Sequence, residues 1–326
     1  MSRIPDMASA ASKQLVRLSR SRRPVARVRT ASASAVGKLA ERLDFERLPP
    51  SVAVHLAYQV VLGRKPDPGG FGQYERAVAA GELSRREMVD ALRGSSEFEQ
   101  RSFSAKMMGN SIHASRCRFV RALPKAATIV DLGGTDLGNP EGAFVGLGYP
   151  YRFDSLTIVD LPSEERHPIY SSSEIEAPID TPRGPVRYSY HSMTDLSVFP
   201  DGSVDLVYSG QSIEHVTPEE GALVLKEVAR ILKPGGYLAL DTPNSRVTRL
   251  QQEEFIDPDH KVEYSWAELR RLIAGAGLAV DWAKGINYAG LSMARQRFMT
   301  EEVAANVGLF DEVEDCYILA CVCRKP

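Results

Sequence analysis

The chain has 326 residues, of which 43% are hydrophobic and 25% charged, an ordinary mixture for a globular protein. This length accommodates one large domain or two of ordinary size. The formal net charge of -2 gives no general reason to expect nucleic-acid binding, and no apolar run is long enough to predict a transmembrane segment.

Residues 1–48 form a basic segment rich in Arg, Ser and Ala, with arginines crowded between residues 17 and 29. We predict a disordered arm. A contact surface for anionic lipid, nucleic acid or a polyanionic glycan carrier is the alternative. No apolar segment follows the arginines, so the arm does not resemble a secretory signal, although an organellar transit peptide has a similar composition. We expect a cytoplasmic protein. Peripheral attachment to a membrane through this arm is the alternative.

Residues 49–104 predict a small all-helical accessory domain. Residues 52–63 carry apolar side chains at helical spacing and end in glycine. Ser84 is followed three positions later by Glu87, which predicts a capping box at the start of another helix. The domain has no cluster of ligand-type residues. A connecting helix is predicted over residues 105–127.

Three stretches of this domain carry a resemblance: YQVVLGRKPDPGGF at 58–71, GELSR at 81–85 and SSEF at 95–98. Together they resemble a helical domain of unknown function that is often attached to bacterial proteins of surface-polysaccharide assembly. The resemblance implies docking to glycan-assembly proteins and implies no chemistry.

Residues 128–326 alternate predicted strands with predicted helices. This alternation predicts a mostly parallel sheet covered on both faces, that is, a Rossmann-like doubly wound α/β fold. Helices are predicted over 218–232 and 266–274, and Asn139 is predicted to cap another helix with Pro140 at its first position. Strands are predicted at 128–130, 156–160, 186–190, 204–209, 237–243, 277–283 and 316–323.

The run TIVDLGGTDLG at 128–138 is the stretch around which a ligand site is predicted. A short apolar strand runs into Asp131, and Gly133 and Gly134 follow at once. Glycines let the backbone bend sharply and approach a ligand. Ligand crevices of doubly wound folds lie at the carboxyl ends of the strands. A purely structural turn is the alternative interpretation.

The residues around the glycine turn restrict the class of ligand that it can bind. Asp160 ends the second predicted strand, where an acid about twenty to thirty residues past the glycine turn accepts hydrogen bonds from ribose hydroxyls. An NAD-type dinucleotide normally needs GxGxxG, and a phosphate-binding P-loop needs GK[ST]; neither pattern is present here. Asp131 beside the turn suits a cationic ligand better than a pyrophosphate.

Four stretches resemble the motifs of one enzyme family: DLGGTDLG at 131–138, TIVD at 157–160, FPDGSVDLVYSGQSIEHV at 199–216 and EVARILKPGGYLALDTPN at 227–244. They are similar to class I S-adenosylmethionine-dependent methyltransferases, and to the large group within them that methylates small molecules, including sugars. The resemblance implies a Rossmann-like domain with S-adenosylmethionine as the cofactor.

The resemblance also implies roles for individual residues. Gly133 and Gly134, beside Asp131, would admit the methionine moiety, and Asp160 would hold the ribose. Ser192 and Met193 fall where the adenine is bracketed, and Ser209 lies near the sulfonium. The cofactor-binding set implied is therefore Asp131, Gly133, Gly134, Thr135, Asp160, Ser192, Met193 and Ser209.

One position departs from the family pattern. Thr135 stands where the family usually has the second glycine of Gly-x-Gly. A β-branched side chain there could narrow the pocket and weaken or abolish cofactor binding.

Candidates for catalysis follow the fourth and fifth strands. Methyl transfer to an alcohol needs alignment and a base. Glu214 and His215 lie just beyond the fourth strand, and His260 follows the fifth strand in the acidic run DPDH at 257–260. Histidine is the usual base near neutral pH. We therefore rank His215 first and His260 second; the alternative is that His215 only shapes the pocket. The DPDH run is too short a signature for a metal site, so we predict none.

The sequence thus predicts a methyltransferase that O-methylates a sugar hydroxyl in bacterial surface-glycan synthesis. The choice of a sugar rests on the accessory domain and is an argument by association. Two alternatives stay open. The chain is a non-catalytic scaffold with a damaged first motif in a glycan-assembly complex, or it methylates a lipid or a nitrogen nucleophile.

Overall fold

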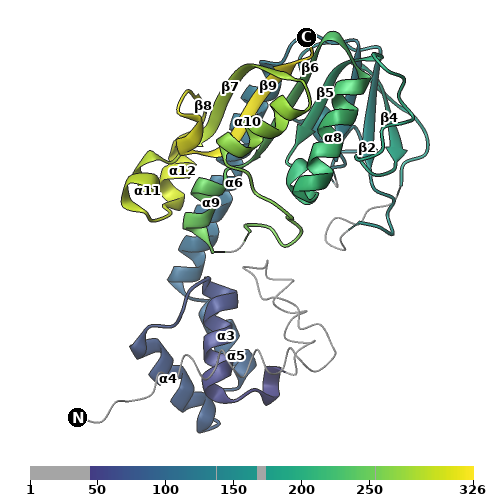
Figure 1. Ribbon diagram of the computed structural model, residues 1–326. Coiled ribbons are helices and arrows are strands. Elements are labelled where there is room, and N and C mark those ends of the chain that lie inside the picture. Colours follow the sequence, from purple (N-terminus) through teal and green to yellow (C-terminus); the bar gives the residue numbers. More distant parts are fainter. Residues whose placement is uncertain (1–44, 137, 167–173, 254) are drawn as a thin grey trace. The chain divides into compact units, whose positions relative to one another are not determined.

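The computed structural model describes residues 45–326 except 137, 167–173 and 254 (Figure 1). The predicted basic arm therefore lies outside the described residues except for its last four. The chain divides into two compact units, Met1–Phe103 and Ser104–Pro326, and each is described by itself. No helix among the described residues has the length and apolar character needed to cross a membrane.

The first unit is helical, as its sequence predicts. Gly63 ends the first α-helix with φ of 61°, a left-handed conformation that glycine adopts without strain. The predicted capping box is present, since Ser84 and Glu87 each bond the other's backbone N–H. The side chain of Arg64 donates two hydrogen bonds of 2.7 Å to Glu97. The elements are η1 (Phe45–Arg47), α3 (Pro50–Leu62), α4 (Pro68–Ala79), α5 (Arg85–Arg93) and the start of α6 (Ser96–Arg121).

Helix α6 differs from the prediction. The sequence predicts a short final turn near residue 95 and a separate connecting helix over 105–127, whereas one helix runs from Ser96 to Arg121. No proline interrupts this stretch before Pro124, so nothing forces the helix to stop. From Ser104 onward α6 belongs to the second unit, and its residues Phe119 and Val120 are fully buried there.

The second unit is built on a nine-stranded sheet with the order β3-β4-β2-β1-β5-β6-β9-β7-β8 (Figure 1). The five strands from β4 to β6 run parallel, whereas β3, β9, β7 and β8 pair antiparallel with their neighbours. The strands are β1 (Thr128–Leu132), β2 (Ser155–Asp160), β3 (Ile179–Thr181), β4 (Gly184–Tyr190), β5 (Val204–Gly210), β6 (Leu232–Pro243), β7 (Ala279–Tyr288), β8 (Leu309–Phe310) and β9 (Cys316–Arg324).

Helices cover both faces of this sheet. Successive residues of β1 point to opposite faces, so Ile129 packs in one core cluster and Val130 in the other. The first cluster includes buried residues of α6, α7, α9 and α12, and the second includes those of α8 and α10. Figure 1 shows α8 and α10 against the same face. The predicted Rossmann-like α/β fold is confirmed. The helices are α7 (Gly142–Gly146), α8 (Pro218–Ile231), α9 (Ser245–Gln251), α10 (Trp266–Gly275), α11 (Gly290–Arg295) and α12 (Thr300–Ala305).

Two local predictions were wrong. Asn139 does not cap a helix: α7 begins at Gly142, and the Asn139 side chain instead accepts a hydrogen bond of 3.0 Å from the N–H of Glu141 within a turn. Strand β6 begins at Leu232 and not near residue 237, because Leu232 already pairs with Val204 ahead of an irregularity in the register. The short elements β3, β8, α9, α11 and α12 were not predicted.

Candidate active site

The predicted ligand residues gather at one edge of the sheet. Strands β4, β2, β1, β5 and β6 are parallel neighbours, so their carboxyl ends meet there. In the register, Leu132 is paired with Val159 on one side and with Ser209 on the other, and Ser209 is paired with Leu240. The residues after these positions therefore line a common rim, which is where ligands of doubly wound folds bind.

The glycine turn after β1 is tightly packed by the protein itself. Gly133 has φ of 71°, and a Cβ built on it would lie 2.7 Å from the Cβ of Ser212. A Cβ on Gly134 would lie 1.9 Å from Oδ2 of Asp131. Both positions need glycine because the segment after β5 closes against one and the Asp131 side chain against the other.

Asp131 is a buried acid at this turn, with 1% of its surface exposed. Among the described residues, neither carboxylate oxygen makes a hydrogen bond of ordinary geometry. Burial raises the pKa of this carboxyl to about 7, while the nearby N–H of Phe144 and the charge of Arg116 oppose the rise. Such a buried acid without a firm partner fits a cationic group of a ligand.

Asp160 is the last residue of β2, as predicted for a ribose acceptor. Its Oδ1 accepts a hydrogen bond of 2.8 Å from the N–H of Leu161 and lies 3.6 Å from Nε of Arg166. Arg166 also stacks over the ring of Tyr190, 5.4 Å from the ring centroid. The sequence did not single out Arg166, because it lies in an irregular segment without a motif.

The other predicted cofactor residues lie on the same rim but differ in their surroundings. Ser192 Oγ is 2.8 Å from Oγ1 of Thr194, and the half-buried Met193 packs against the second core cluster. Ser209 is buried, with its Oγ 2.7 Å from Oγ of Ser212. Thr135 has a buried hydroxyl with no hydrogen-bond partner within the described part of the chain.

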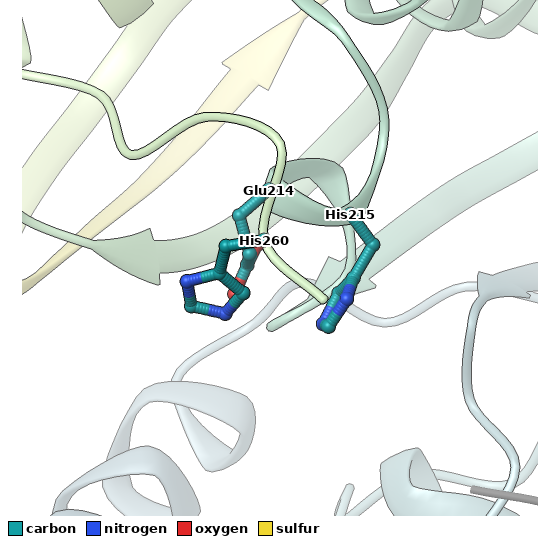
Figure 2. Close-up of side chains that lie close together, drawn as sticks. All are labelled: Glu214, His215 and His260. Carbon is teal, nitrogen blue, oxygen red and sulfur yellow. The ribbon is translucent and has the colours of Figure 1, made fainter. Parts of the chain in front are cut away.

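The three predicted catalytic side chains are brought together. Glu214 and His215 come from the short helix η3 (Ile213–His215) after β5, and His260 comes from the loop between α9 and α10. One possible ligand atom from each lies within 4.8 Å of the others (Figure 2). The two rings meet edge to face, with centroids 5.0 Å apart. The N–H of Lys261 donates to the carbonyl of Glu214 at 2.8 Å, which fixes the loop against η3.

Glu214 is fully buried within this cluster. Its Oε2 accepts a hydrogen bond of 2.9 Å from Oγ1 of Thr242, whereas its Oε1 has no partner among the described residues. Burial raises the pKa of the carboxyl to about 7, opposed by the neighbouring His260. The site therefore holds an acid whose second oxygen is available.

Each histidine of the cluster faces a carboxylate through Nδ1. His215 Nδ1 lies 3.2 Å from Oδ2 of Asp259, and His260 Nδ1 lies 2.9 Å from Oε1 of the buried Glu263. Burial and the neighbouring His260 lower the pKa of His215 below its usual range, against the charge of Asp259. His215 is therefore neutral near pH 7 and able to accept a proton or a cation.

A buried polar network lies beside the cluster and was not predicted from the sequence. Asp241, at the end of β6, accepts hydrogen bonds from Arg116 at 2.7 Å, from Tyr208 at 2.6 Å and from Gln211 at 2.9 Å. Asp241 could have been found as an acid near the end of a buried strand. Arg116 could not, because it lies on α6, far away in sequence and without a motif.

Comparison with protein families agrees with the two-unit description. Residues 156–240 match the family described as a methyltransferase domain. Residues 51–102 match a domain of unknown function, DUF4214. Both kinds of domain are predicted from the sequence, although the second match carries no link to polysaccharides.

Curated relatives match part of the chain. A probable S-adenosylmethionine-dependent methyltransferase of Mycolicibacterium smegmatis is 34% identical over 112 residues, 34% of this chain and 42% of that protein. A second one, from Mycobacterium tuberculosis, is 37% identical over 78 residues, 24% of this chain and 28% of that protein. The chain thus matches less than half of the length of each relative.

Solved structures resemble the chain at low identity. A methyltransferase in complex with the Haloferax volcanii Trm112 activator is 22% identical, with a TM-score of 0.46 over 69% of this chain and 94% of that chain. A SAM-dependent methyltransferase from Thermotoga maritima is 18% identical, also with a TM-score of 0.46, over 70% of this chain and 96% of that chain. From the family match and its own strand order, the second unit of the chain carries a class I methyltransferase domain with a Rossmann-like α/β fold.

Proposed function

We propose that the chain is an S-adenosylmethionine-dependent methyltransferase that methylates a hydroxyl group. The observation that carries this proposal is the gathering of Glu214, His215 and His260 on the rim that also holds the buried Asp131, within a methyltransferase domain. One part of the rim suits a cationic cofactor, and another suits the activation of an acceptor.

The cofactor side is assigned to the ends of β1, β2 and β4. S-adenosylmethionine supplies an electrophilic methyl group when it is bound. Asp131 would accept the ammonium of the methionine moiety, because a cation gives its buried carboxylate a partner. Asp160 would accept from the ribose hydroxyls, and Ser192 and Met193 would flank the adenine. The absence of side chains at Gly133 and Gly134 leaves room for Ser212 and for the carboxylate of Asp131, respectively.

Thr135 and Ser209 complete the proposed cofactor set. The Thr135 hydroxyl is buried and lacks a partner within the described residues, so a polar group of the ligand would satisfy it. Ser209 lies in register with the last residue of β1, next to the turn. Replacement of the family's second glycine by Thr135 therefore adds a hydrogen-bonding group as well as bulk.

The acceptor side is assigned to Glu214, His215 and His260. A neutral amine already carries a lone pair and needs no help to attack carbon, whereas a hydroxyl must be relieved of its proton. Two imidazoles and a buried carboxylate in one cluster are more than an amine acceptor requires. This cluster favours an oxygen acceptor over a nitrogen acceptor.

A sugar hydroxyl in bacterial surface-glycan synthesis is the acceptor we propose. The support is the N-terminal helical domain, whose resemblance suggests docking to glycan-assembly proteins in the cytoplasm. This part of the proposal rests on association and not on the geometry of the site.

A non-catalytic scaffold is the competing function, favoured by Thr135 in the first motif and by the ion pair of Asp160 with Arg166. The test is a screen of glycan, lipid and amine acceptors with S-adenosylmethionine, read by mass spectrometry. Transfer to a glycan hydroxyl supports the proposal. Transfer only to a lipid or an amine corrects the acceptor, and no transfer together with no cofactor binding supports the scaffold.

A further inference from the structure

We propose that Glu214, His215 and His260 form a binding site for one divalent transition-metal ion. The three residues come from two segments, η3 and the loop before α10, and their ligand atoms lie within 4.8 Å of one another (Figure 2). The sequence alone does not predict a metal site here, because its only local signature is the run DPDH at 257–260. In the fold, His260 of that run joins Glu214 and His215 from η3, the short helix that follows β5.

The donor set defines the class of ion. Two imidazole nitrogens and one carboxylate oxygen suit manganese, iron, cobalt or zinc, whereas magnesium and calcium prefer oxygen ligands only. A set of two histidines and one carboxylate occupies one face of the ion and leaves other positions open. The site would therefore bind an ion and still accept an outside ligand.

The spacing of the three side chains is somewhat wider than that around a bound ion. Three donors held at roughly 2.0–2.2 Å from one ion, on one face of it, lie about 3–3.6 Å from each other. The three ligand atoms here lie within 4.8 Å of one another. Side-chain rotations that shorten these separations by up to about 1–2 Å would bring the donors to one ion.

Glu214 provides an independent observation. Its side chain is fully buried, and its Oε1 has no hydrogen-bond partner in the described part of the chain. Leaving a buried carboxylate oxygen without a partner is costly. Its other oxygen is already engaged by Thr242, so Oε1 is the atom that a cation would satisfy.

The surroundings of both histidines have the form found around metal ligands. Metal-binding histidines almost always pair their second ring nitrogen with a carboxylate, a carbonyl or water. Here Asp259 faces Nδ1 of His215, and Glu263 faces Nδ1 of His260. Glu263 is itself held by Thr248 at 2.5 Å and by the N–H of Ile256 at 2.7 Å. With Nδ1 engaged in this way, Nε2 of His260 is the nitrogen that would bind the ion.

The role of the ion rests on the proposed function. An ion in this position would bind the acceptor hydroxyl and lower its pKa as a Lewis acid. The hydroxyl proton would pass to solvent as the carbon–oxygen bond forms, and the carbon–sulfur bond would break with its electron pair remaining on sulfur. Both histidines would act as ligands, and neither would be the proton acceptor.

The test uses the full chain after removal of metal with a chelator. Cobalt(II) is added and followed by its visible absorption, which reports nitrogen coordination, and zinc, manganese and magnesium are added in competition. We expect one cobalt(II) per chain, displaced by zinc and hardly by magnesium. Absence of saturable cobalt(II) binding would overturn the proposal.

Variants locate the site. His215→Ala changes a ligand whose side chain is 24% exposed, so folding is expected to survive. His215→Ala and Glu214→Gln should each weaken cobalt(II) binding by at least about tenfold, since even outer-shell changes cost 10–100-fold. His113→Ala, on the exposed side of α6, is the matched control and should bind as the unaltered chain does. Ligand variants that stay folded and bind cobalt(II) like the control would also overturn the proposal.

Binding of S-adenosylhomocysteine is measured on the same samples. If it binds and cobalt(II) does not, the metal site is wrong and the methyltransferase function stands. If cobalt(II) binds at these residues and S-adenosylhomocysteine does not, the metal site stands and the proposed function is wrong.

Discussion

Nε of Arg116 lies 2.7 Å from Oδ1 of Asp241, and this pair joins α6 to the end of β6 inside the second unit. Asp241 is fully buried, and its other oxygen accepts a hydrogen bond of 2.6 Å from Tyr208. The next residue along β6, Thr242, donates to Glu214. The buried pair therefore lies directly behind the acceptor side of the candidate site.

Removing Arg116 should destabilise the fold. Arg116→Ala leaves the carboxylate of Asp241 buried without its charge partner, and breaking such a pair costs about 3–5 kcal/mol. Urea denaturation measures the loss in unfolding free energy. Arg118→Ala is the matched control, because Arg118 is exposed on the same helix and, among the described residues, bonds only a backbone carbonyl. Equal stability of the two variants would show that the pair contributes little.

Asp160 should govern cofactor affinity. If its carboxylate accepts from ribose hydroxyls, Asp160→Ala loses charge-assisted hydrogen bonds, and S-adenosylhomocysteine should bind more than about tenfold more weakly. Calorimetry measures this change. Asp154→Ala provides the control, since Asp154 is exposed just before the opposite end of β2. Wild-type affinity in Asp160→Ala would show that the assignment of this residue is wrong.

Asp131 should make stability depend on pH. Its folded-state pKa is raised to about 7 from an ordinary value of 3.8, so the protonated form favours the folded chain. This stabilisation is complete below the ordinary pKa and is lost as the pH rises through the raised one. Asp131→Asn should therefore raise the melting temperature more at about pH 8 than at about pH 5. An equal change at both values would mean that Asp131 does not titrate in this way.

The same acid should couple cofactor binding to pH. Because the ammonium of the ligand favours the ionised carboxylate, affinity for S-adenosylhomocysteine should rise between about pH 6 and pH 8, with release of a proton. Calorimetry in two buffers of different ionisation enthalpy counts that proton. Asp131→Asn should bind more weakly and release none.

Replacing either histidine of the cluster should lower the rate of methyl transfer to a similar extent. As ligands of one ion, His215→Ala and His260→Ala should both lower the single-turnover rate by at least about a hundredfold, the low end of what activating a hydroxyl contributes. Affinity for S-adenosylhomocysteine should stay nearly unchanged, and His113→Ala should react normally. A large loss of rate in His215→Ala but not in His260→Ala would indicate that His215 is a base. Normal rates in both variants would indicate that Glu214 or Asp257 is the base.

Local signals account for what the sequence predicted well. The capping box of Ser84 and Glu87 and the apolar run of β1 are encoded within a few residues, and both occur as expected. Helix α6 was misjudged because the absence of a break between Ser96 and Arg121 is a weaker signal than a motif. Asn139 was misjudged because an Asn side chain bonds a turn as readily as a helix N-terminus.

The candidate site shows the same contrast between what local motifs predict and what depends on the fold. Motifs pointed to Glu214, His215 and His260 one by one, since each follows a strand end. Their convergence depends on how far the loop before α10 folds back onto η3, and the backbone bond from Lys261 to Glu214 that sets this is not readable from sequence. The roles of Asp259 and Glu263 could not be predicted from sequence, because each depends on the contact of its carboxylate with a histidine of the cluster.

Binding of S-adenosylhomocysteine to the chain with and without residues 1–104 tests the central claim most directly. All the residues assigned to the cofactor lie in the second unit. Calorimetry should give one binding site per chain in both proteins, with affinities that agree within a few-fold. If the full chain binds neither S-adenosylhomocysteine nor S-adenosylmethionine, the account is contradicted and the scaffold interpretation stands. Loss of binding in the folded truncated chain alone would contradict a cofactor site confined to the second unit.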